Sequence, residues 1–83
     1  MEKIVKKTTL VNGKKQSVSY LVLKKALEDL QDSVNSTMVD LKIEENGFTI
    51  THEFIGLSEI ETTEHIYEFL SDEQAQEIRK DFE

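Results

Sequence analysis

The sequence has no cysteine, proline or tryptophan and only three glycines among its 83 residues. Without cysteine there is no disulfide framework, no thiolate metal site and no cysteine nucleophile. Gly13, Gly47 and Gly56 stand far apart, so the chain has no glycine-rich loop of the kind that cradles a phosphate. The longest apolar run, residues 20–23, is far too short to cross a bilayer. With no stretch resembling a signal peptide either, these absences predict a soluble cytoplasmic protein that carries no cofactor.

Basic residues are also scarce, and they are unevenly placed. Ten Lys and Arg against 17 Asp and Glu give a formal net charge of −7. Residues 1–25 hold seven lysines and one glutamate, whereas residues 26–83 hold sixteen acidic residues and only three basic ones. The chain therefore has a basic head and a long acidic body. The sequence leaves open whether the two lie against each other or meet different partners.

Two segments have the features of β-hairpins. Strand-forming residues fill positions 3–11 and lead into Asn12-Gly13, a strong hairpin signal because both residues tolerate the positive φ of a type I′ turn. Within residues 37–54, positions 39–44 and 48–54 have a period of two on either side of a predicted turn at Asn46-Gly47, with Val39, Leu41, Ile43, Phe48, Ile50, His52 and Phe54 on one face. This alternation predicts an antiparallel hairpin with one buried face and one solvated face.

The segment after the first hairpin has a helical apolar stripe. Leu23, Leu27, Leu30 and Val34 lie at i, i+4, i+7 and i+11, which predicts a helix over residues 23–34 after a strand that ends near residue 22. The boundary within residues 16–24 stays ambiguous, because residues 16–23 also alternate. The alternative is a helix that starts earlier, near residue 17 or 19, although no capping box marks either position.

The last third of the chain is predicted to be helical. From about Glu59 onward the apolar residues Ile60, Ile66, Tyr67 and Leu70 suggest one helix. Ser71 followed by Gln74 matches a capping box, so a new helix is predicted to start at Asp72.

These segments predict one α+β domain over residues 1–83. Two antiparallel β-hairpins would form one sheet with helices packed on one face, in the order ββαββαα. The predicted core consists of the apolar side chains that would face inward in this arrangement, namely Leu23, Leu27, Leu30, Val39, Leu41, Ile43, Phe48, Ile50, Phe54, Ile66, Leu70 and Ile78.

The sequence contains few candidate catalytic residues, and the main candidates are its two histidines. His52 belongs to the alternating pattern of its strand, which favours a half-buried sheet residue over a catalytic base. In the predicted helix, His65 would share a face with Glu61 and Glu68, which could offer ligands to a divalent ion. No second histidine lies at ligand spacing there, so a solvated acidic face is the favoured interpretation. We therefore predict no metal site, no catalytic residues and no enzymatic activity.

The acidic body suggests a binding function instead. Nine of the residues from 59 to 83 are acidic, and a continuous helix would place one negative charge about every 4 Å along its axis. One strand of duplex DNA carries a phosphate about every 3.4 Å. The leading interpretation is a small acidic non-enzymatic module, an inhibitor or regulator that docks on a basic, nucleic-acid-binding surface of a partner protein. Such a DNA mimic would suit an accessory protein of a phage or mobile element. The predicted partner-binding residues are Glu61, Glu64, Glu68, Asp72, Glu73 and Glu77.

Two alternatives use other parts of the chain. The basic N-terminal hairpin, with Lys3, Lys6, Lys7, Lys14 and Lys15, could contact DNA or RNA, although it has no arginine and the acidic body would repel phosphate. A homodimeric structural module is the second alternative, in which sheet edges and Tyr20, Leu21 or Phe82 pair with another copy. No membrane partner is predicted.

Overall fold

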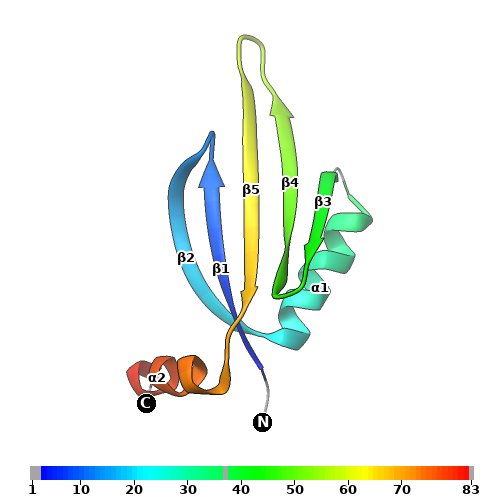
Figure 1. Ribbon diagram of the computed structural model, residues 1–83. Helices are drawn as coiled ribbons and strands as arrows, with labels where there is room; N and C mark the ends of the chain where they lie inside the picture. The colour runs from blue at the N-terminus through cyan, green and yellow to red at the C-terminus, as the bar shows by residue number, and fades with distance from the viewer. Residues whose placement is uncertain (1–2, 37, 83) are drawn as a thin grey trace.

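The computed structural model describes residues 3–36 and 38–82, with the side chains of residues 38 and 79–82 left out (Figure 1). Its elements, in chain order, are β1 (Ile4–Val11), β2 (Lys14–Val22), α1 (Leu23–Val34), β3 (Met38–Glu44), β4 (Gly47–Ile55), β5 (Ile60–Phe69) and α2 (Asp72–Phe82). The strands form one five-stranded antiparallel sheet in the order β2-β1-β5-β4-β3. The α+β class is confirmed.

Both hairpins form where the sequence predicted them. β1 pairs with β2 across a two-residue turn in which Asn12 and Gly13 have φ values of 52° and 81°, the positive values that this turn requires. β3 pairs with β4 across Glu45 and Asn46, one residue earlier than the predicted Asn46-Gly47 turn, so that Gly47 is the first residue of β4. Both turns also contact β5, since Asn12 exchanges hydrogen bonds with the backbone of Thr62 and the carbonyl of Asn46 accepts from the N–H of Phe69.

Both predicted helix starts are also confirmed. α1 begins at Leu23, where the backbone N–H of Leu23 donates to the carbonyl of Lys3, and β2 remains paired with β1 up to Val22. The earlier start considered above is wrong. At α2, the N–H of Gln74 donates to Ser71 Oγ at 3.3 Å, while the N–H of Ser71 donates to Gln74 Oε1 at 3.0 Å. These reciprocal hydrogen bonds are the predicted capping box.

The predicted helix from Glu59 is wrong, because residues 60–69 form the strand β5. The order is therefore ββαβββα instead of ββαββαα. β5 is the central strand and pairs with β1 along one edge and with β4 along the other. Its β-branched and aromatic residues, including Thr62, Thr63 and Tyr67, suit a strand, and the helical spacing of its apolar residues was coincidental.

The pairing register gives the sheet two different faces. On the helix-covered face, Val5, Phe48, Ile50 and Tyr67 are buried against Ala26 of α1 and form the core. The other face, which we call the open face, carries the remaining residues of the register. These are Ile4, Lys6, Thr8 and Leu10 of β1; Lys15, Val18, Tyr20 and Val22 of β2; Asp40, Lys42 and Glu44 of β3; Gly47, Thr49, Thr51, Glu53 and Ile55 of β4; and Ile60, Thr62, Glu64, Ile66 and Glu68 of β5.

The two helices do not share one face of the sheet, which corrects the second part of the predicted arrangement. α1 crosses the helix-covered face, whereas α2 lies beyond one end of the sheet (Figure 1). α2 borders the open face only at that end, where Gln74, Glu77 and Ile78 line a hollow together with Lys6 and Tyr20. Most of the open face therefore has no helix over it.

The core is smaller than predicted. Phe48, Ile50 and Leu70 are buried as predicted, and other predicted members such as Leu23 and Leu41 are half-buried. Four predicted core residues are exposed, namely Leu27, Val39, Ile43 and Phe54. Ile43 and Phe54 lie on the helix-covered face and Leu27 belongs to the predicted stripe of α1, yet α1 does not bury them. The buried residues that are absent from the predicted core are Val5, Ala26, Tyr67 and Ala75.

β4 and β5 extend beyond their neighbours as a two-stranded arm, residues 53–62. The last pair between β3 and β4 involves His52, and the last pair between β1 and β5 involves Thr63. Beyond these pairs the ribbon projects away from the sheet (Figure 1). Its four large apolar side chains are all exposed, which are Phe54, Ile55, Leu57 and Ile60.

Gly47 gives a test of the fold. It lies at the start of β4, opposite Glu68 on β5, and a Cβ added there would overlap the backbone carbonyl oxygen of Tyr67. Because backbone must move to make room, we expect Gly47→Ala to destabilise the protein by roughly 2–3 kcal/mol. Gly56→Ala is the matched control, since its Cβ would come no closer than 3.4 Å to another residue. Urea unfolding followed by circular dichroism measures both, and equal stability of the two variants would contradict this register.

Candidate functional site

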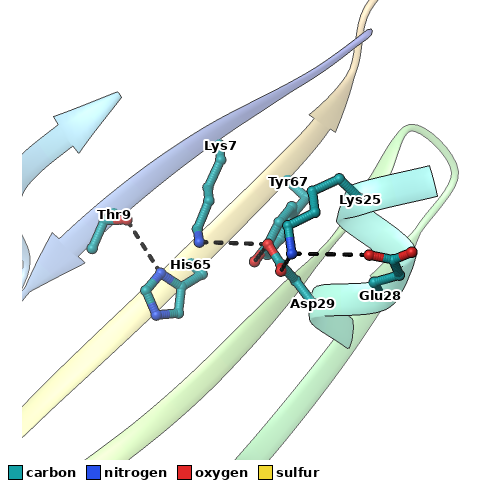
Figure 2. A network of polar contacts seen from close by, with 7 residues as sticks. All are labelled: Lys7, Thr9, Lys25, Glu28, Asp29, His65 and Tyr67. Carbon is teal, nitrogen blue, oxygen red and sulfur yellow. Dashed lines mark hydrogen bonds and ion pairs between the residues drawn. The ribbon is translucent and has the colours of Figure 1, made fainter. Parts of the chain in front are cut away.

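Asp29 of α1 is the centre of a polar network on the helix-covered face (Figure 2). Its carboxylate lies 3.7 Å from Nζ of Lys7 on β1 and 3.6 Å from Nζ of Lys25 on its own helix. The hydroxyl of Tyr67 on β5 donates to Asp29 Oδ2 at 3.4 Å. The network therefore links α1 to the two neighbouring strands β1 and β5.

The surroundings of Tyr67 stabilise its neutral form. Burial raises the pKa of the Tyr67 hydroxyl above its usual range, and the negative charge and hydrogen bond of Asp29 raise it further. The ring of Tyr67 stacks on Phe48 with centroids 4.5 Å apart, and Lys7 Nζ lies 5.4 Å from the same ring. Tyr67 thus acts as a core aromatic whose polar end is satisfied by the helix.

His65 lies next to this network, further along β5. Its Nδ1 is 3.2 Å from the hydroxyl of Thr9 on β1, and its ring meets that of His52 edge to face with centroids 5.9 Å apart. Burial lowers the pKa of His65; the positive charge of Lys7 and the neighbouring His52 lower it further, while Asp29 opposes them. The imidazole is therefore neutral near pH 7. His52 is half-buried in its strand, as predicted.

The Thr9 hydroxyl beside the neutral His65 imidazole matches two groups of a catalytic triad, the nucleophile and the general base. The third group of a triad is a carboxylate that orients the imidazole. Among the residues that the structure describes, no carboxylate forms an ion pair with His65, and Asp29 is engaged with Lys7, Lys25 and Tyr67. The observed contacts are those of a structural polar cluster that holds β1, β5 and α1 together.

The possible metal ligands around His65 are separated by the strand geometry. Glu61 shares the helix-covered face with His65, but Glu68 lies on the open face, because alternate residues of a strand point to opposite sides. Within the described part of the chain, no group of three or more His, Cys, Asp or Glu side chains is placed to hold a metal ion. The shared helix face on which this alternative depended does not exist.

The six predicted partner-binding residues fall into two groups. Glu68 at the end of β5 and Asp72, Glu73 and Glu77 of α2 lie at one end of the molecule, and we call them the α2-end acids. Glu61 and Glu64 lie nearer the arm and on opposite faces of the sheet. The single acidic helical face assumed above is therefore wrong. Within the described residues none of the six forms an intramolecular ion pair, since the recorded pairs involve Lys7, Lys25 and Lys42 with Asp29, Glu28 and Glu44.

Two adjoining hollows accompany the α2-end acids. The larger, about 500 Å³, is lined by polar groups such as Glu45, Glu68 and Gln74 and by the apolar Phe69 and Leu70. The smaller, about 270 Å³, lies between α2 and the open face and includes Glu68, Glu77 and Lys6. Glu68, Leu70 and Gln74 line both hollows, so this end of the molecule presents carboxylates beside apolar surface.

Most of the network around Asp29 was not visible in the sequence. The spacing of Lys25 and Asp29, four residues apart on a helix, is the one local signal that could have indicated an ion pair. Thr9 meets His65 across 56 residues, and Asp29 meets Tyr67 across 38. These contacts follow from the pairing of β1 with β5, which the sequence analysis missed.

Comparison with protein-family models, curated proteins and solved structures found no match to this chain. Neither helix has the combination of length and apolar composition, in the residues that the structure describes, that spanning a membrane requires.

The lowered pKa of His65 predicts how stability depends on pH. The unfolded chain, with an ordinary histidine pKa of 6.5, binds a proton that the folded protein resists, so acidification below about pH 6.5 favours unfolding. We expect His65→Gln to reduce the loss of melting temperature between pH 7.5 and pH 5.5 by on the order of 2 °C. Thermal unfolding of both proteins at both pH values measures this difference, and an identical pH dependence would refute it.

Proposed function

We propose that this protein is a small non-enzymatic binding module whose acidic surface docks on a basic surface of a partner protein. The proposal rests on one observation: the six acids named above form no ion pair with the described residues of their own chain. Between residues 43 and 78 the sequence contains no Lys or Arg at all. Within the described residues no cation neutralises these acids, so their charge can attract cationic groups from a partner.

The α2 end is the better candidate for the contact surface. It gathers Glu68, Asp72, Glu73 and Glu77, while Glu61 and Glu64 stand apart from it. The adjoining hollow places carboxylates beside Phe69 and Leu70. Long cationic side chains fit such a surface well, since their hydrocarbon stems cover apolar atoms while their charged ends meet carboxylates.

This geometry reduces the part of the molecule that could mimic nucleic acid. The continuous helical row of charges that matched one DNA strand is interrupted by β5. A partner that binds nucleic acid would be contacted through the compact α2 end, where the carboxylates would occupy a few phosphate positions. An inhibitory or regulatory role follows from blocking those positions, and the phage or mobile-element context stays a hypothesis.

The nucleic-acid-binding alternative rests on Lys3, Lys6, Lys14 and Lys15, since Lys7 pairs with Asp29. Lys14 and Lys15 lie exposed at the β1–β2 turn, and none of the four forms an ion pair within the described residues. Four lysines make a weak electrostatic footprint on a chain of net charge −7.

The test compares two charge-matched variants in binding to a fluorescent ten-residue oligo-arginine peptide. Glu68→Gln/Glu73→Gln/Glu77→Gln removes three charges at the α2 end, and Asp32→Asn/Asp40→Asn/Glu59→Gln removes three charges elsewhere. We expect at least a tenfold loss of affinity for the first variant and less than a threefold loss for the second, as measured by fluorescence anisotropy. Equal losses would show that only overall charge matters and would overturn the proposed surface.

A duplex of random sequence in low salt serves as the second probe. The proposal expects no binding, because phosphate is repelled by the acidic body. Binding that disappears in Lys14→Gln/Lys15→Gln would instead support the nucleic-acid alternative and overturn the leading one.

A further inference from the structure

The open face has a self-complementary distribution of charge. Its β1–β2 half carries Lys15 together with the apolar Leu10 and Val18. Its other half, on β4, β5 and the arm, carries Glu53 and Glu64 together with Ile55, Ile60 and Ile66. One half is therefore basic and apolar, and the other is acidic and apolar, with Lys42 of β3 on the acidic side paired to Glu44. Within the described residues no ion pair joins the two halves.

The amount of exposed apolar surface is large for a chain of this size. Among the described residues seven apolar side chains are buried, whereas nine large ones are exposed, and three of these nine, Tyr20, Ile55 and Ile60, lie on the open face. Leu57 at the arm tip is fully exposed, and Ile55 is 75% exposed although it lies directly opposite Ile60. A two-stranded ribbon is only marginally stable by itself in water. Covering the arm would therefore stabilise it.

We propose that the open face is a docking surface for a second copy of this chain. Two sheets would pack face to face, with the β4–β5 half of each copy lying over the basic β1–β2 half of the other and the two arms lying against each other. The described part of α2 meets the open face at the end away from the arm, where it lines a hollow with Lys6, Tyr20 and Glu68 (Figure 1). The rows of the open face nearer the arm are not covered by the described side chains of α2.

The charges select the direction of the twofold axis. An axis parallel to the strands exchanges the two halves of the face, so that Lys15 of one copy approaches Glu53 of the other. An axis across the strands would place basic half over basic half and acidic half over acidic half, which is repulsive. The proposed dimer therefore keeps the strands of the two sheets roughly aligned, as in aligned sheet packing.

The open face is close to the size that a stable dimer needs. With about 4.8 Å between strands and about 3.3 Å per residue, the five strands make a face of on the order of 700 Å². A standard interface buries about 800 Å² on each partner. The occupant suggested by these dimensions and charges is the chain itself.

Sedimentation equilibrium of the full chain from 5 to 200 µM tests the association. We expect the mass to rise from 9.6 kDa toward twice that value. Ile55→Glu on the open face should weaken the dimer at least tenfold, whereas Ile43→Glu should leave it unchanged. The two positions are matched in exposure, at 75% and 74%, but Ile43 lies on β3 and on the helix-covered face. A monomer at 200 µM, or a dimer broken by Ile43→Glu and not by Ile55→Glu, would overturn the proposal.

Charge reversal tests the orientation. Glu53→Lys lowers the net negative charge, which by itself favours association, and yet we expect it to weaken the dimer several-fold because it meets Lys15 of the second copy. Lys15→Glu should weaken the dimer similarly, and Lys15→Glu/Glu53→Lys should restore at least half of the lost affinity. A stronger dimer in Glu53→Lys, or no recovery in the double variant, would overturn the proposed axis. Circular dichroism of each variant confirms that the fold is retained.

Discussion

The main-chain pairing of β5 is the constraint on which the rest of this structure depends. Each hairpin can form by itself around its own turn, but neither has enough surface to be stable alone. β5 pairs with β1 on one side and with β4 on the other, and so converts two hairpins into one sheet. The same pairing brings Val5, Tyr67 and Phe48 onto one face of the sheet, over which α1 closes the core. Without β5, α1 would have no continuous surface to cover.

The polar network on the helix-covered face follows from this arrangement. Asp29 reaches both Lys7 and Tyr67 because β1 and β5 are adjacent and α1 lies over them. His65 is held between Thr9 and His52 for the same reason. These contacts satisfy polar groups at the border of a small core, which is where an unpaired group would cost the most free energy relative to the stability of the whole.

Folding keeps the charge separation of the chain instead of cancelling it. The described ion pairs connect residues within 7–44, and none joins the lysines of the first 25 residues to the acids beyond residue 45. The structure divides the acids into two regions with different surroundings. Those at the α2 end border hollows with apolar walls, and those near the arm lie beside exposed isoleucines. The proposed contact with a basic partner and the proposed association of two copies would thus use different parts of the surface, which share Glu68.

The sequence by itself determined the local structure: both hairpins, the start of α1 and the capped start of α2. These features depend on residues close together in the chain, such as Asn12 with Gly13 and Ser71 with Gln74. Only the tertiary structure decided that residues 60–69 are a strand, because their apolar spacing allowed either state and the pairing with β1 and β4 chose between them. That choice also decided which acids lie together. Side chains that would share one face of a helix point to opposite faces of a strand.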